Sequence, residues 1–206
     1  MQIEREQIQD LYVIGNPHVT RELINTINQE AWTVTLVDHV GRLRSTLTSS
    51  AKVPQAEIVE AWLSLRNDET QRLCLARQLI MAKLANYSVL ARSVRSLQDK
   101  DGLHHELREY AEKAREATSM NQLLGFEGQA AKVWFQGLSR RLPTEYRFSR
   151  RVAPGANDPV NVLLNLGYTV LYRLLSRFLI QQGFLTTIGV LHQPRRNHEA
   201  LVSDFQ

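Results

Sequence analysis

The sequence is poor in the residues that cross-link, break or anchor a chain. Its 206 residues include 1 cysteine, 6 prolines and 10 glycines. The lone cysteine, Cys74, excludes an internal disulfide and a four-thiolate zinc site. The longest apolar stretch, residues 160–172, is interrupted by polar residues and is too short to cross a bilayer. Residues 1–20 lack the apolar core of a signal peptide, so we expect a soluble, cytoplasmic protein with no membrane partner.

Charge is nearly balanced overall but unevenly placed along the chain. Residues 1–130 carry 15 Lys and Arg against 17 Asp and Glu, whereas residues 131–206 carry 10 against 4. Nine of those 10 cations are arginine, which binds phosphate through two parallel hydrogen bonds. The excess is therefore typical of a protein with a polyanionic partner. A solvated basic face has the same composition, so charge alone leaves both interpretations open.

The first quarter of the chain has the pattern of a small β-rich unit. Residues 11–14 form a short apolar run that is closed by the turn signal Gly15-Asn16-Pro17. Residues 32–37 are rich in strand-forming side chains, and residues 42–47 alternate leucine with polar residues. Between the first two segments, Thr20 is suited to cap a short helix.

Helical periodicity begins after a boundary that we place at residues 49–54. An apolar stripe over residues 69–96 predicts a long helix or helix pair, and the charged residues 99–116 predict an exposed helix. Beyond an arginine-rich loop, Asp158-Pro159 is a start signal for a helix that ends near Gln182. The sequence thus predicts an α+β protein, with a partial β-sandwich in residues 1–50 and a larger all-helical domain in residues 51–206.

Glu127 is the first residue that does not fit a purely structural interpretation. A helix is predicted from about Glu127 to Ser139, and Glu127 shares its apolar face with Ala130 and Ala131. A carboxylate in a first turn usually stabilises exposed backbone amides and the helix dipole. A catalytic or metal-binding carboxylate is the alternative, and the spacing does not separate the two.

The long helix after Pro159 carries a polar stripe among apolar residues. Its members lie at positions i, i+4, i+7 and i+11: Asn161, Asn165, Tyr168 and Tyr172. Polar groups that face inward either hydrogen-bond within the core or line a cavity, and both remain open. Farther on, His192 lies in a short apolar run and Asp204 follows 12 residues later; a histidine in such a run is usually structural.

Four segments over residues 126–204 together carry a family resemblance. They are Phe126-Glu127-Gly128-Gln129-Ala130-Ala131, Asp158-Pro159-Val160-Asn161 with its continuation to Tyr168, Gly189-Val190-Leu191-His192, and Ala200-Leu201-Val202-Ser203-Asp204. In this order they resemble the CRISPR-associated Cas-one family, the integrase and nuclease of spacer acquisition. More loosely, Val13-Ile14-Gly15, residues 34–38 and Gly41-Arg42 resemble its N-terminal β domain, and Lys83-Leu84-Ala85-Asn86 a motif of its first long helix.

Two departures from the family lead us to expect a chain truncated at both ends. The family has opening strands ahead of the one at Leu11, and an acidic residue three positions beyond the aspartate that matches Asp204. Without these segments, we expect an unpaired strand edge and exposed apolar surface around Leu191, Leu201 and Phe205, and hence a tendency to aggregate.

The resemblance implies a metal-dependent DNA endonuclease and integrase that inserts foreign DNA spacers into a CRISPR array, with the helical domain as the catalytic one. It implies Glu127, His192 and Asp204 as catalytic residues and metal ligands. Two carboxylates and an imidazole suit Mg²⁺ or Mn²⁺, and zinc is not excluded. Water as the nucleophile gives cleavage, whereas a DNA 3′-hydroxyl gives strand transfer.

The resemblance also assigns DNA contacts and partners. Asn161, Asn165, Tyr168 and Tyr172 would hold the scissile strand. Five arginines would contact DNA phosphates: Arg140, Arg141, Arg147, Arg150 and Arg151. The implied partners are double-stranded, branched or repeat DNA, a second copy of the chain, and a dimer of the Cas-two protein. The alternatives are a noncatalytic DNA-binding or scaffold fragment, and a helical RNA-binding module that uses the arginine loop.

Overall fold

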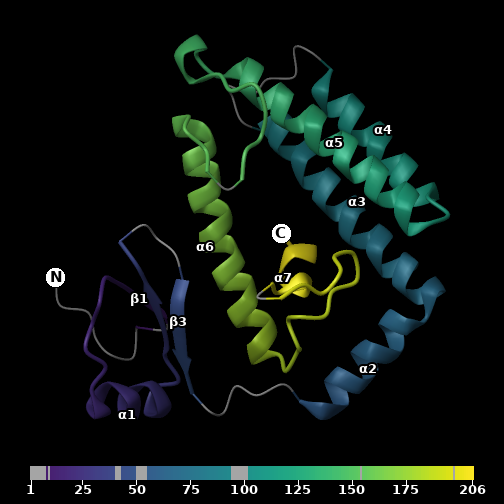
Figure 1. The fold of residues 1–206 in the computed structure, drawn as a ribbon. Helices are drawn as coiled ribbons and strands as arrows, with labels where there is room; N and C mark the ends of the chain where they lie inside the picture. Colours follow the sequence, from purple (N-terminus) through teal and green to yellow (C-terminus); the bar gives the residue numbers. More distant parts are fainter. Residues whose placement is uncertain are drawn as a thin grey trace. The chain divides into compact units, whose positions relative to one another are not determined.

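The structure is a computed structural model that describes residues 8, 10–39, 43–49, 55–93, 102–153, 155–196 and 198–206. Contacts divide the chain into two compact units, Met1–Gln55 and Ala56–Gln206. The first contains strands and one helix, and the second is mostly helical (Figure 1). This confirms the predicted α+β class. Residues 40–42, and residues 50–54 of the predicted boundary at 49–54, lie outside the described residues.

The β-rich unit is built on one three-stranded sheet in the order β1-β2-β3. β1 (Asp10–Ile14) pairs in parallel with β2 (Thr33–Val37), and β3 (Leu43–Thr48) pairs antiparallel to β2. A parallel pair requires a crossover, which α1 (Arg21–Gln29) supplies. Thr20 caps α1 as predicted, because its hydroxyl accepts a hydrogen bond from the backbone N–H of Leu23 at 3.2 Å. Within the described residues this sheet has no second layer of strands facing it, as a sandwich would require.

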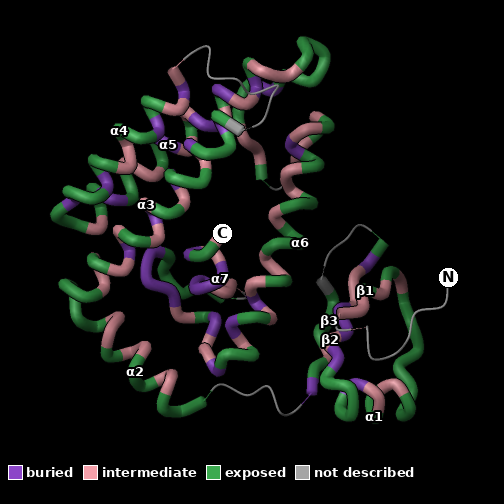
Figure 2. Tube along the Cα trace, turned by 180° about the vertical axis from the view of Figure 1, so that it is seen from behind, coloured by how far each residue is buried: buried purple, intermediate pink, exposed green. Residues whose placement is uncertain are grey.

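Three helices of the second unit pack against one another: α3 (Glu69–Ser93), α4 (Leu103–Glu116) and α5 (Met120–Arg141). A further helix, α2 (Ala56–Asn67), precedes α3 and lies outside the predicted stripe. Their shared core includes the fully buried Leu84 and Leu107. Buried positions recur along these helices in Figure 2. The prediction that α4 is simply an exposed helix is therefore wrong, because its apolar residues complete this core while its charged residues face outward.

The predicted start of α5 at Glu127 is also wrong. The helix begins at Met120, and its N-cap Ser119 accepts a hydrogen bond from the backbone N–H of Gln122 at 3.3 Å. Gly125 lies inside the helix, where packing outweighs its cost of about 1 kcal/mol relative to alanine. Glu127 is consequently two turns into α5, so it does not cap the first-turn amides.

The start and end of α6 (Pro159–Gln181) match the prediction. The carboxylate of Asp158 accepts a hydrogen bond from the backbone N–H of Asn161 at 2.8 Å, and Gly183 follows the helix with a φ of 84°. The polar stripe is buried or half-buried, whereas many apolar residues of α6 are exposed, and much of the helix is coloured as exposed in Figure 2. Seven of them are 40 to 66% exposed: Val162, Leu163, Leu166, Val170, Leu171, Leu174 and Phe178. Apolar faces of this extent are typical of surface that another segment or chain covers.

The short helix α7 (Ala200–Asp204) packs on α6 through the buried Leu201 and Val202, which contact Leu179. The expected exposure at Leu191 and Leu201 is wrong, since these residues are 5% and 0% exposed, while Phe205 is 47% exposed. Among the helices that the structure describes, none is both long and apolar enough to span a membrane.

Candidate functional site

Glu127 lies half-buried on α5 and pairs with a lysine of α3. Its Oε1 atom is 2.8 Å from Nζ of Lys83. One turn after Lys83, the ring of Tyr87 stacks on Trp134 with the ring centroids 4.8 Å apart. Burial raises the pKa of Tyr87 above its usual 10.0, and the neighbouring Tyr168 and Glu127 raise it further. We call these four residues, Lys83, Tyr87, Glu127 and Tyr168, the Glu127 corner.

Arg151 ties the loop before α6 to the polar stripe of that helix. Its Nη1 donates hydrogen bonds to Oδ1 of Asn165 at 2.6 Å and to Oδ1 of Asn161 at 3.2 Å. Its guanidinium also lies over the ring of Tyr168, 5.0 Å from the centroid. Arg151, Asn165, Tyr168 and Tyr172 line an open pocket of about 540 Å³. Three of the four predicted strand-holding residues therefore share one cavity.

The fourth, Asn161, is fully buried and engaged within the protein. Its Oδ1 accepts from Arg151 and from the backbone N–H of Val152, and its Nδ2 donates to Asp158 and to the backbone carbonyl of Arg150. An asparagine amide has two donors and two acceptor positions, and all four are used here. Asn161 fixes the loop to α6 and has no atom left to offer to a DNA strand.

His192 lies in an irregular turn between α6 and α7. The side chain of Asp204 is fully buried and accepts hydrogen bonds from the backbone N–H groups of Val190, Leu191 and His192, the last two at 3.1 and 2.9 Å. The Oδ1 of Asp204 is also 2.8 Å from Nδ1 of His192, whose side chain is half exposed. The structure thus brings His192 and Asp204 into direct contact.

Tyr172 links the polar stripe to the segment before α7. Its hydroxyl accepts a hydrogen bond from the backbone N–H of Glu199 at 2.9 Å. The Glu199 carboxylate in turn accepts from the hydroxyls of Ser176 and Thr186 at 2.7 and 2.6 Å. Burial raises the pKa of Tyr172, so this phenol is a neutral anchor at the C-terminal end of the stripe.

The three predicted metal ligands have suitable chemistry but are not assembled as a site. The Glu127 carboxylate faces an ammonium group, and the Asp204 carboxylate faces backbone N–H donors. Over the described part of the chain, no group of three or more His, Cys, Asp or Glu side chains is arranged to hold an ion. Joint binding of one metal ion by Glu127, His192 and Asp204 therefore stays a prediction.

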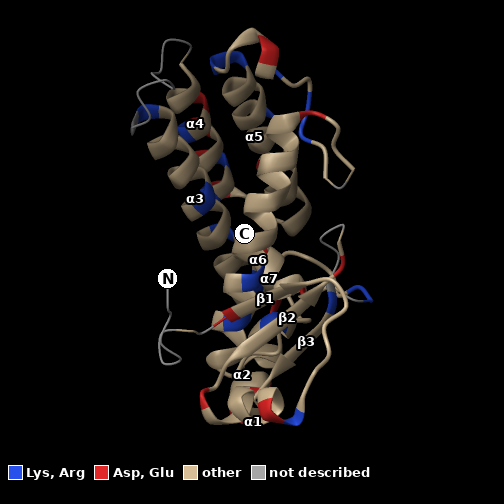
Figure 3. Ribbon diagram, turned by 90° about the vertical axis from the view of Figure 1, so that its left-hand side faces the viewer, with Lys and Arg blue, Asp and Glu red and all other residues tan. Residues whose placement is uncertain are grey.

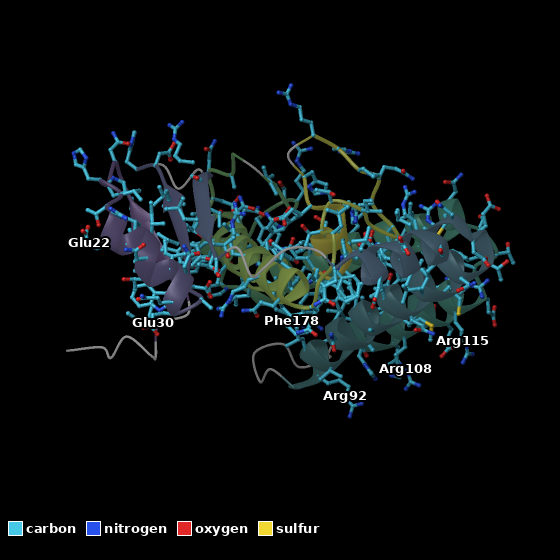
Figure 4. All side chains as sticks on the ribbon, turned by 90° about the horizontal axis from the view of Figure 1, so that it is seen from below. Glu22, Glu30, Arg92, Arg108, Arg115 and Phe178 are labelled. Carbon is cyan, nitrogen blue, oxygen red and sulfur yellow. The ribbon has the colours of Figure 1, made fainter. Side chains whose placement is uncertain are left out.

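The five predicted phosphate-binding arginines differ in their surroundings. Arg140, Arg147 and Arg150 are exposed. Figure 3 shows basic positions at the end of α5 and in the loop that follows. Arg141 and Arg151 are half-buried, and Nη1 of Arg141 donates to the carbonyl of Gly137 at 3.2 Å. Cations elsewhere, such as Arg108 and Arg115 of α4, also point into solvent (Figure 4). Exposure alone therefore does not distinguish a DNA contact from a solvated face.

Two residues of the Glu127 corner, Lys83 and Tyr87, received no role from the sequence. They are four residues apart on α3 and so share one helical face. The signal that could have found them was the lysine itself, which interrupts the apolar stripe of this helix next to Leu84.

The sequence profile of the family described as CRISPR associated protein Cas1 matches residues 1–206. The chain belongs to the Cas1 family. A CRISPR-associated endonuclease Cas1 of Methanospirillum hungatei is 30% identical over 200 residues, which cover 95% of this chain and 60% of that protein. A CRISPR-associated endonuclease Cas1 of Mycobacterium tuberculosis is 26% identical over 97% of this chain and 59% of its own length.

Solved structures show the same Cas1 fold. A Cas1 protein from Thermotoga maritima superposes with a TM-score of 0.81 over 98% of this chain and 63% of its own length, at 20% identity. A Cas6-RT-Cas1–Cas2 complex matches with a TM-score of 0.77 at 28% identity, over 96% of this chain and 22% of that one. The chain thus spans about three fifths of the curated Cas1 relatives named above.

Proposed function

We propose that this Cas1 chain provides the DNA endonuclease and integrase chemistry by which foreign spacers are inserted into a CRISPR array. The observation that carries the proposal is the family match over residues 1–206, together with relatives that are named endonucleases. The chain spans about three fifths of the length of those relatives, so we propose, for this chain, the activity that their names give to the whole proteins.

The Glu127 corner supports a site that acts on phosphodiesters. It combines a carboxylate, an ammonium group and two phenols within one half-buried cluster. Next to it, Tyr168 and Asn165 line the open pocket of about 540 Å³ together with Arg151. Cationic and hydrogen-bonding groups beside a carboxylate are suited to hold a DNA strand through its phosphates.

A requirement for Mg²⁺ or Mn²⁺ remains part of the proposal. Such an ion would supply a Lewis acid for hydrolysis or strand transfer at phosphorus. The predicted ligands are Glu127, His192 and Asp204, which the described arrangement does not bring together. Metal binding is therefore a separate question for experiment.

The proposed partners are DNA, a second copy of the chain and a Cas2 dimer. Support for Cas2 comes from the solved relative at 28% identity, which is described as a Cas6-RT-Cas1–Cas2 complex. For DNA, the exposed Arg140, Arg147 and Arg150 form the basic segment after α5. Double-stranded DNA with a branch or repeat end is the proposed substrate, bound through its phosphates with little sequence preference.

A noncatalytic DNA-binding or scaffold role is the second candidate. It is favoured by the pairing of Glu127 with Lys83 and by the engagement of Asp204 with backbone amides, which leave neither carboxylate free. In that case the chain binds DNA and Cas2 but does not cleave.

Nicking and strand transfer on branched DNA separate the two candidates. We expect activity that requires Mg²⁺ or Mn²⁺, is abolished by Glu127→Gln and is unchanged by Glu109→Gln, a matched change on the exposed face of α4. Binding of the same DNA is measured in parallel by fluorescence anisotropy. Binding without cleavage by the unmodified chain would establish the scaffold role and overturn the enzymatic proposal.

A further inference from the structure

The turn that carries His192 is held by side chains from three helices. Residues 188–192 have no regular secondary structure, so their backbone groups need other partners. Three consecutive carbonyls accept hydrogen bonds from side chains of α2 and α3. Nε1 of Trp62 donates to Ile188 at 2.8 Å, Nε of Arg66 to Gly189 at 3.1 Å, and Nε of Arg72 to Val190 at 2.8 Å.

The amide side of the same turn is held from α7. The backbone N–H groups of residues 190, 191 and 192 all donate hydrogen bonds to the carboxylate of Asp204. Gly189 makes this approach possible, since a Cβ atom there would lie 2.6 Å from Oδ2 of Asp204 and 2.9 Å from the carbonyl carbon of Ala200. The turn is thus bound by cationic and indole donors on one side and by an anionic acceptor on the other.

This arrangement decides which ring nitrogen of His192 is available. An ionised carboxylate only accepts hydrogen bonds, so the short contact between Oδ1 of Asp204 and Nδ1 requires a proton on Nδ1. In the neutral ring the lone pair is then on Nε2, the nitrogen that faces away from Asp204. A carboxylate that fixes the tautomer of a histidine commonly controls how that histidine binds or transfers protons.

We propose that Asp204 is a positioning residue rather than an ion ligand. Together with Trp62, Arg66 and Arg72 it sets the location of His192 and directs the unprotonated Nε2 outward. The inference rests on the proposed function only in giving His192 a role at the site. The hydrogen-bond arrangement itself is tested without DNA, so its failure and the failure of the proposed activity are distinguishable.

The first measurement is the tautomer of His192 by ¹⁵N NMR at about pH 8.5, well above the ordinary imidazole pKa. We expect the Nδ1-protonated form to predominate in the unmodified chain, and Asp204→Asn to abolish this preference. The second is amide hydrogen exchange at residues 190–192. We expect protection that falls by about tenfold or more in Asp204→Asn, because hydrogen bonds to a charged group are lost.

A matched pair on α3 keeps the test decisive if Asp204→Asn does not fold. Arg72→Met removes the bond to the turn, whereas Arg77→Met removes an equivalent 2.8 Å bond to the carbonyl of Ala117. We expect only Arg72→Met to speed exchange at residues 190–192 and to broaden the ring signals of His192. An Nε2-protonated ring in the unmodified chain, or equal effects of the two arginine variants at the turn, would overturn the proposal.

Discussion

The Glu127 corner and the His192 turn are placed by different physical means. Glu127 lies inside α5, a helix of 22 residues whose backbone satisfies its own hydrogen bonds. Its position therefore depends mainly on helix packing, to which the ion pair with Lys83 is added. His192 lies on irregular backbone whose carbonyls and amides are satisfied by side chains of α2, α3 and α7. Distant substitutions should therefore displace His192 far more readily than Glu127.

The same substitution at one glycine of each region should give the largest contrast. Gly189→Ala places a Cβ atom against Asp204 and Ala200, so we expect a loss of about 1–3 kcal/mol in the free energy of unfolding. Gly128→Ala on α5 meets no atom within 4 Å, and alanine favours helix, so we expect a gain of up to about 1 kcal/mol. Urea unfolding measures both. Equal losses would show that the helix is as tightly constrained as the turn.

Substitutions of the loop arginines test whether Arg151 stabilises the fold or contacts DNA phosphates. Arg150 is exposed, so Arg150→Ala should flatten the slope of log affinity for DNA against log salt by about one unit. Arg151 holds Asn161 and Asn165, so Arg151→Ala should instead lower the midpoint of thermal unfolding. Both quantities are measured for both variants. An unchanged slope in Arg150→Ala would assign that arginine to the solvated surface.

Charge pairing at the Glu127 corner should have a smaller effect on stability. The side chains of Lys83 and Glu127 are 30 and 24% exposed, so solvent screens their attraction. A double-mutant cycle with Lys83→Met and Glu127→Gln should give a coupling of about 0.5–1 kcal/mol in urea unfolding. A coupling near zero would mean that Lys83 contributes nothing to the placement of Glu127.

The contribution of Tyr87 to the free energy of unfolding should fall at alkaline pH. Its folded-state pKa is raised, so the phenol stays protonated in the fold after it ionises in the unfolded chain. The contribution of the Tyr87 phenol to the free energy of unfolding is therefore complete below about pH 10, and it is lost as pH rises above that value. Comparing Tyr87→Phe with the unmodified chain at pH 7 and about pH 11 should show a difference that shrinks on the alkaline side. The matched variant Tyr146→Phe, on an exposed side chain, is the control.

Local signals in the sequence predicted several boundaries well. Thr20 before α1 and Asp158-Pro159 before α6 are caps that work through contacts within three residues. Such contacts are local, so the sequence is sufficient to predict them. The start of α5 failed for the opposite reason. Gly125 lies just before the predicted start, but the packing of Leu123 and Ala130 in the helical core keeps that segment helical.

The candidate site was predicted only in part. The residues of the polar stripe were identified from their spacing on α6, and three of them share a pocket. Asn161 could not be separated from the others, because its four hydrogen bonds come from residues 150–158 and depend on how the loop folds back. Lys83 and Tyr87 were missed because they come from α3, far earlier in the chain than α5. Lys83 and Glu127 are separated by 44 positions.

Short segments of neighbouring residues were sufficient to predict the three strands, the caps of α1 and α6, and the family. Which side chains meet depends instead on how distant segments pack. Lys83 reaches Glu127 across 44 positions, and Arg72 reaches the carbonyl of Val190 across 118. The same holds for α6, whose polar face turns inward because Arg151 and Tyr87 offer it partners there. Periodicity identifies a face, but burial of that face depends on the side chains that distant segments bring to it.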